Sequence, residues 1–313
     1  MVDDYASPVA YRLKWLYLLG LVALLMVPVG YNFYISFNEF GFGAAQYQFT
    51  LDWYWAVFQD EQLLSALRWT LGLAVATTLI VIPFGVLSAK LFRQTRRKLW
   101  LLGLMLLPLF VPADIFASSM LVYFKNLNGL FASIAETTGL GFFETWFDLG
   151  FITAVIGLVV YTLPYVFVVI LITMGRYREE QTEAARACGA STWRAFWDIE
   201  FPQIRPGVLS ACAFTVILVF NEYVRTAMLK GGFDTFTTIL ISQMLNTGMS
   251  EQSYAMGGIV SLVAIVVIGS IIIFSLISAE RIERRNRAVA EPGSGLAQRP
   301  TAPSSPLKDQ PVS

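Results

Sequence analysis

The segment Phe151–Met174, FITAVIGLVVYTLPYVFVVILITM, is an unbroken apolar run without a charged residue. An α-helix rises about 1.5 Å per residue and needs about 20 residues to cross a hydrocarbon layer about 30 Å thick, so this segment is long enough to span a membrane. Within lipid the backbone has no water to bind, and a run of this length must pair its N–H and C=O groups internally as a helix. The segment therefore predicts an all-α membrane protein.

Five further stretches along the chain share this length and apolar character. They are Trp15–Phe37, Trp69–Ala89, Leu99–Phe124, Gly207–Leu229 and Met256–Ala279. Together with the first segment they predict six transmembrane helices. The stretch nearest the N-terminus is longer than the roughly 7–15 apolar residues of a signal peptide and no clear cleavage site follows it, so we expect it to be retained.

Composition agrees with a membrane protein and argues against an enzyme. Hydrophobic residues make up 56% of the chain and charged residues 14%, whereas soluble domains carry roughly 25% charged residues. The absence of histidine from the sequence removes histidine-based triads and metal sites, so no catalytic residue and no metal site is expected. Cys188 and Cys212 lie far apart without ligand spacing. The net charge of zero argues against nucleic acid as a partner.

Lys and Arg residues are distributed unevenly over the connections between the spans. With the C-terminal tail left out, sixteen fall on one side of the predicted membrane and four on the other. The poorer side has Arg68, Lys125, Arg225 and Lys230. Because basic residues are enriched in cytoplasmic loops, the richer side is predicted to be cytoplasmic, and both termini with it.

The chain divides into three parts by composition. Residues 1–14 are expected to form a cytoplasmic N-terminus and residues 15–287 the transmembrane domain. Residues 288–313 are rich in Pro, Ser and Gly and are expected to be a disordered cytoplasmic tail. No internal repeat is visible, which argues against an ion-driven secondary transporter built from inverted repeats.

The longest connection on the predicted cytoplasmic side, residues 176–206, is too rich in helix formers to be a plain loop. Glu179–Ala187 is predicted to be a helix, because Glu, Ala and Arg favour this conformation. Gly189 is expected to end it in the left-handed conformation, and Ser191 suits the N-cap of a second helix. Pro202 and Pro206 are expected to end that second helix.

Three aromatic residues of the second helix, Trp193, Phe196 and Trp197, share one face by their spacing. Water is a poor neighbour for such a face, so it requires a partner. From these residues alone, docking on another protein and insertion among lipid headgroups are both open interpretations.

The same connection carries the pattern EAA-x3-G-x9-I-x-F-P. It is formed by Glu183, Ala184, Ala185, Gly189, Ile199, Phe201 and Pro202. The pattern resembles the EAA loop of ABC-importer permease subunits, EAA-x3-G-x9-I-x-L-P, with Phe201 where leucine is usual. With the predicted six helices, the resemblance covers most of the chain.

The resemblance implies a type I ABC importer permease (MetI-like) fold in a bacterial cytoplasmic membrane. It also implies partners: an ABC ATPase dimer, a second homologous permease subunit, an extracytoplasmic substrate-binding protein and membrane lipid. The residues it assigns to ATPase coupling are Glu183, Ala184, Ala185, Gly189, Ile199 and Pro202. The chain lacks a G-x-x-x-x-G-K-[ST] motif, so ATP and Mg are expected on the partner ATPase and no cofactor on this chain.

Two segments bear on the cargo, residues 40–67 and residues 106–122, LLPLFVPADIFASSMLV. Both resemble spermidine/putrescine permease subunits, which implies a polyamine as cargo, with a sugar or phosphonate as alternatives. Asp114 and Glu222 would suit a cation, because a carboxylate inside a span costs about 2.5–3.5 kcal/mol unless it is paired or wet.

The expected substrate path comprises Asp114, Tyr161, Asn221 and Glu222. Alternatives stay open: Asp114 can instead pair with a partner permease or cap a helix broken at Pro112, and Tyr161 can be a packing residue. Arg225 is expected either to contact an acidic receptor surface or to end a solvated loop.

Overall fold

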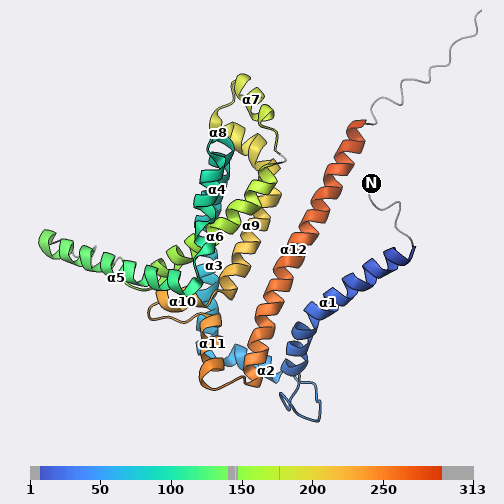
Figure 1. Cartoon of the computed structure of the whole chain (residues 1–313), viewed down its shortest axis with the longest axis vertical. Helices are drawn as coiled ribbons and strands as arrows, with labels where there is room; N and C mark the ends of the chain where they lie inside the picture. Colours follow the sequence, from blue (N-terminus) through green and yellow to red (C-terminus); the bar gives the residue numbers. More distant parts are fainter. Residues whose placement is uncertain (1–7, 140–144, 146, 176, 291–313) are drawn as a thin grey trace, which may run out of the picture. The chain divides into compact units, whose positions relative to one another are not determined.

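A computed structural model describes residues 8–290, apart from 140–144, 146 and 176, and this part of the chain is predominantly helical (Figure 1). The chain divides into two units, Met1–Ile268 and Gly269–Ser313. The described part of the second unit is the C-terminal portion of helix α12 (Glu251–Ala290). Residues 291–313, where a disordered tail is expected from sequence, lie outside the described residues.

The spans and the connecting helices follow in chain order. They are α1 (Pro8–Ser36), α2 (Asp52–Gln59), α3 (Glu61–Gln94), α4 (Lys98–Leu106), a 3₁₀ turn (Leu107–Phe110), α5 (Ala113–Thr138), α6 (Phe151–Met174), α7 (Glu179–Ala187), α8 (Thr192–Ala195), a π turn (Phe196–Glu200), α9 (Phe201–Asn221), α10 (Val224–Leu229), α11 (Phe236–Asn246) and α12. Within the described ranges, five helices are long and apolar enough to cross a membrane, or six if the bent pair formed by α4 and α5 counts as one span.

The third predicted span is a broken helix. The structure does not continue as one helix over Leu99–Phe124, because α4 with its 3₁₀ turn and α5 meet at 96°. Val111 is extended (φ −88°, ψ 126°), as expected for a residue that precedes a proline, and Pro112 is the N-cap of α5. The expectation of one continuous helix over this stretch is therefore wrong, and the break lies at Pro112, while α4 and α5 together can still count as one span.

The fifth predicted span, Gly207–Leu229, is shifted along the chain. Helical structure runs without interruption from Thr192 to Asn221, so Pro202 and Pro206 do not end the helix that Ser191 begins. Pro202 occupies the first turn of α9, where its missing N–H costs little, and a proline inside a membrane helix is tolerated when neighbouring groups compensate. The helix stops instead at Asn221, and α10 follows as a separate short helix.

The core of the first unit lies where α3, α6 and α9 pack against one another. Small residues permit this close approach, as is usual between membrane helices. A Cβ on Gly85 would lie 2.4 Å from Val166, and one on Gly207 would lie 2.1 Å from the Thr173 hydroxyl. These contacts hold the three helices as one packed body.

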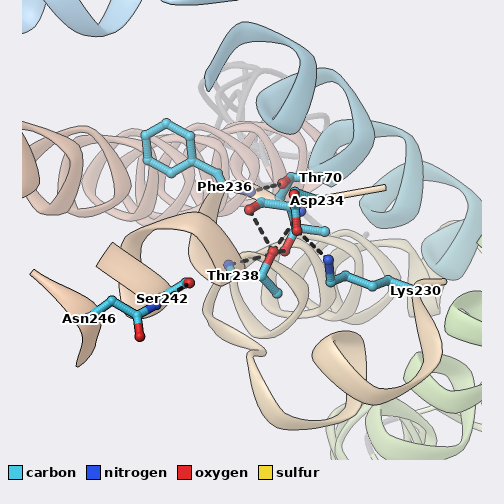
Figure 2. A network of polar contacts seen from close by, with 8 residues as sticks. Thr70, Lys230, Asp234, Phe236, Thr238, Ser242 and Asn246 are labelled. Atoms are coloured by element: carbon cyan, nitrogen blue, oxygen red, sulfur yellow. Dashed lines mark hydrogen bonds and ion pairs between the residues drawn. The ribbon is translucent and has the colours of Figure 1, made fainter. Parts of the chain in front are cut away.

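Toward the N-terminal end of α3, threonine hydroxyls connect α11 to α3 (Figure 2) and also to α9. The Thr70 hydroxyl accepts a 2.9 Å hydrogen bond from the Phe236 amide. Thr235 caps α11 by accepting from the Thr238 amide, and the Thr237 hydroxyl donates to the Phe220 carbonyl. The connection between α10 and α12 thus contains a short helix, α11.

Candidate functional site

Helices α7 and α8 form a hook, Glu179–Ala195, between α6 and the π turn that leads to α9. The first helix has the bounds that the sequence predicts, and Gly189 ends it with φ +90°. Ser191 caps α8, its hydroxyl accepting a hydrogen bond of 3.3 Å from the Arg194 amide. An added Cβ on Gly189 would meet nothing within 4 Å, so this position requires glycine for its backbone conformation and not for space.

The residues of the EAA pattern occupy two places. Glu183 and Ala184 are exposed on α7, close in sequence to the exposed Gly189 turn. Ile199 lies half-buried in the π turn and Pro202 lies exposed in the first turn of α9. The first part of the pattern, from Glu183 to Gly189, therefore lies largely on the surface, and the second part, from Ile199 to Pro202, lies where the hook connects to α9.

Two tryptophans, one on α8 and one in the π turn that follows, form an exposed aromatic surface at the end of the hook. Trp193 is 72% exposed and Trp197 43% exposed, and their ring centroids lie 5.5 Å apart. Phe196, predicted on the same face, is half-buried and lies under the Lys90 ammonium at 4.8 Å from its ring centroid. Its ring also packs against Trp197, with centroids 5.3 Å apart, so the three aromatic residues form one cluster as predicted, in which Phe196 lies on the less exposed side.

A cluster of charged residues at the C-terminal end of α3, which sequence reasoning missed, binds the hook. Lys90 Nζ lies 2.8 Å from Glu200 Oε2, and the Glu200 side chain is 7% exposed. Arg93 donates to the Met174 carbonyl at 3.0 Å and pairs with Glu179 at 3.3 Å. The available sequence signal was Glu200 itself, an acid in the unspecified position of the pattern, followed directly by a span.

The same cluster surrounds a polar cavity of about 150 Å³ beneath the hook. Its walls come from the end of α3, from α7 and from Glu200. Tyr177, in the connection from α6 to α7, contributes its ring to this wall and stacks 5.0 Å from the Arg93 guanidinium. Burial raises the pKa of the Tyr177 phenol above its ordinary value of 10.0, while its hydrogen bond with Thr182 opposes the rise.

A second charged group lies at the break between α9 and α10. Glu222 and Arg225 form an ion pair of 3.0 Å in which both side chains are 8% exposed. The Arg225 guanidinium lies 4.1 Å from the Tyr161 ring centroid on α6 and 5.6 Å from that of Phe116 on α5. Arg225 is therefore buried, and its interpretation as the end of a solvated loop is wrong.

Of the four residues expected along a substrate path, the structure brings two together. Tyr161 and Glu222 both contact Arg225. Asn221 is exposed and its side chain donates to the Ile217 carbonyl at 2.8 Å. Asp114 is exposed in the first turn of α5, where a carboxylate interacts favourably with the helix dipole. No ion pair joins Asp114 to another group in the described part of the chain.

The fold and the hook define an ABC importer permease. The chain belongs to the family of inner membrane components of binding-protein-dependent transport systems, whose sequence profile matches residues 81–288. The family is a multi-pass transport component and not a catalytic enzyme. The resemblance drawn from the EAA pattern is thereby confirmed.

Two curated relatives cover most of the chain at similar distances. The spermidine/putrescine transport system permease protein PotC of Escherichia coli K12 is 24% identical over 254 residues, which cover 80% of this chain and 89% of PotC. The sulfate transport system permease protein CysW of Synechocystis is 26% identical over 266 residues, which cover 82% of this chain and 90% of CysW.

A solved structure confirms the predicted MetI-like permease fold. A chain of a bacterial ABC transporter involved in the import of the acidic polysaccharide alginate superposes with a TM-score of 0.63 at 18% identity. The match covers 87% of this chain and 96% of that one. A second structure of an alginate transporter, in complex with an alginate pentasaccharide-bound periplasmic protein, gives a TM-score of 0.58 at 18% identity, over 88% of this chain and 94% of that one.

Proposed function

We propose that the hook of this permease docks on a cytoplasmic ATPase and couples ATP hydrolysis to movement of the spans. The observation that supports this most directly is the geometry of the hook. Two short helices joined at Gly189, together with the π turn that follows them, expose Glu183, Ala184 and two tryptophans at one end of the packed spans. An exposed helical surface of this kind suits a helix-in-groove contact with a partner protein.

The remaining parts of the assembly follow from the same proposal. ATP and Mg bind to two ATPase copies, and a second homologous permease completes the membrane pathway. An extracytoplasmic binding protein delivers cargo at the other face. The hook and both termini are cytoplasmic in a bacterial inner membrane, in agreement with the Lys and Arg distribution.

Helix α1 is the surface that we assign to lipid or to the second permease. It carries no charged residue after Lys14, and Leu16 and Leu24 are 71% and 70% exposed. An apolar patch of this extent needs a nonpolar partner. Both candidates for that partner are part of the proposed assembly.

The proposed cargo is a polyamine. Similarity to PotC and the exposed Asp114 carboxylate at the break of the third span support it. Glu222 adds no free charge, because Arg225 neutralises it. The comparable similarity to CysW makes sulfate the competing cargo, and a sugar or phosphonate is a further alternative. Isothermal titration of the cognate binding protein with spermidine and with sulfate separates the first two, and binding of sulfate without spermidine would overturn the polyamine assignment.

The coupling proposal is tested by Gly189→Arg in proteoliposomes that contain the whole assembly. An arginine side chain at a φ of +90° is strained and obstructs the surface that docks. We expect assembly to persist, ATP hydrolysis to continue and import to be lost. A variant that imports at the native rate would contradict the role of the hook. Gly43→Arg, a positive-φ glycine with nothing within 4 Å of its Cβ position but distant from the hook in sequence, is the matched control.

A further inference from the structure

We infer that side chains of the C-terminal turn of α3 bind both ends of the hook, so that α3 moves with the hook when the ATPase acts. This inference rests on the proposed coupling function and assigns Lys90 and Arg93 as positioning residues. The resemblance to the EAA pattern involves neither of them. Both lie on α3, which the chain connects to the hook only through α4, α5 and α6.

The two basic residues reach opposite ends of the hook. Arg93 bonds the last carbonyl of α6, at Met174, and pairs with Glu179, the first residue of α7. Lys90 pairs with Glu200, which follows the hook at the junction with α9. Residues three apart on a helix share a face, so one face of α3 holds the entry and the exit of the hook.

The burial of Glu200 makes the exit contact strong. A carboxylate that is 7% exposed requires a partner, and the Lys90 ammonium at 2.8 Å supplies it. The same ammonium lies over the Phe196 ring, so the lysine is held by two neighbours in the π turn. The π turn, Phe196–Glu200, places the Phe196 ring beside Lys90 of α3 while Trp197 stays exposed, and single-turn π-bulges inside α-helices are frequent at functional sites.

The mechanical consequence concerns α3. Its covalent neighbours at this end are the connection to α4 and not the hook, so side-chain contacts must carry any displacement of the hook to α3. Along its length α3 packs against α6 and α9. A displacement of the hook is thus applied to all three core helices together, to α6 and α9 through the chain and to α3 through Lys90 and Arg93.

The test measures a distance between the hook and α3 in the purified assembly. Spin labels are placed on native Cys188, which is exposed beside Gly189, and on a cysteine at exposed Leu79 of α3, with Cys212 replaced by alanine. Distances are recorded by pulsed electron resonance with and without the nucleotide analogue AMP-PNP and Mg. In the native sequence we expect one distance that the nucleotide leaves unchanged.

Three variants define the outcome. Lys90→Met with Glu200→Met removes the ion pair without leaving a buried charge. With nucleotide bound, we expect the distance distribution of this variant to show a second population in place of the single native distance. The exchange Lys90→Glu with Glu200→Lys should restore the single distance, which a purely steric role of these side chains would not do. Lys230→Met, which removes another lysine of an ion pair, is the control and should leave the native result.

If the assembly hydrolyses ATP, the ATPase is engaged, and two results would then overturn this inference but leave the proposed function standing. One is a native hook whose distance to α3 changes with nucleotide. The other is a Met–Met variant that behaves as the native protein. Absence of an ATPase from the purified assembly would instead overturn the proposed function and the inference with it.

Discussion

Replacement of Arg225 by methionine should destabilise the folded protein by about 3–5 kcal/mol, because it leaves the buried Glu222 carboxylate without its partner. The magnitude follows from the surroundings of the pair. Both side chains are 8% exposed, and the arginine also stacks on the Tyr161 and Phe116 rings. Buried cation–π contacts of this kind contribute up to about 2 kcal/mol, part of which methionine replaces by packing.

The double variant Glu222→Gln with Arg225→Met is the informative comparison. Glutamine removes the buried charge and can still accept the 3.0 Å hydrogen bond from the backbone amide of residue 225. We expect this variant to lose about 1–2 kcal/mol, the range of an imperfectly satisfied buried polar group. The double variant is therefore predicted to be more stable than the single one.

The assay is equilibrium unfolding of the purified chain in mixed micelles titrated with sodium dodecyl sulfate and followed by tryptophan fluorescence. Native protein, both single variants and the double variant form a mutant cycle. A loss below about 1 kcal/mol for Arg225→Met, or a double variant less stable than the single one, would refute the reasoning from an uncompensated buried charge.

Three further predictions concern the backbone and a phenol. Gly231→Ala should lower the free energy of unfolding by more than the roughly 1–2 kcal/mol that a left-handed residue costs, because φ is +67° and the new Cβ would lie 2.0 Å from the Leu149 carbonyl oxygen. Thermal unfolding should show no such loss of stability for Gly232→Ala, whose Cβ meets nothing within 4 Å. Gly189→Ala should lose only those roughly 1–2 kcal/mol, since its surroundings are open, and a larger loss would mean that the turn is packed in the assembly. The raised pKa of Tyr177 means that the unfolded chain ionises first, so this phenol lowers stability as pH rises above 10.0, and Tyr177→Phe should weaken the alkaline loss in a pH series of unfolding curves.

The hook could be predicted from the sequence because its local signals agree. Helix formers over Glu179–Ala187, a glycine at the turn and Ser191 at the next cap all specify the same local structure. The structure has these bounds and this cap. The break at Pro112 was also visible as an alternative, since the residue before a proline avoids the helical conformation.

The contacts between helices could not be predicted from one sequence. The pair of Lys90 and Glu200 joins residues 110 positions apart, and no local signal indicates that they meet. The interpretation of Arg225 as the end of a solvated loop was wrong because this residue lies in α10, a short helix that packs against α5 and α6 and buries it. Tertiary packing decided both cases, and periodicity alone does not report packing between distant elements.

Photo-cross-linking from the hook tests the central proposal, docking on an ATPase, most directly. A photoreactive phenylalanine replaces Trp193, and in a matched sample it replaces Trp55, which is 63% exposed on α2 just before the other end of α3. The account predicts that position 193, in native membranes, forms an adduct with a subunit carrying a G-x-x-x-x-G-K-[ST] motif, and that position 55 does not. Adducts of position 193 with lipid alone, or the same ATPase adduct from position 55, would contradict it.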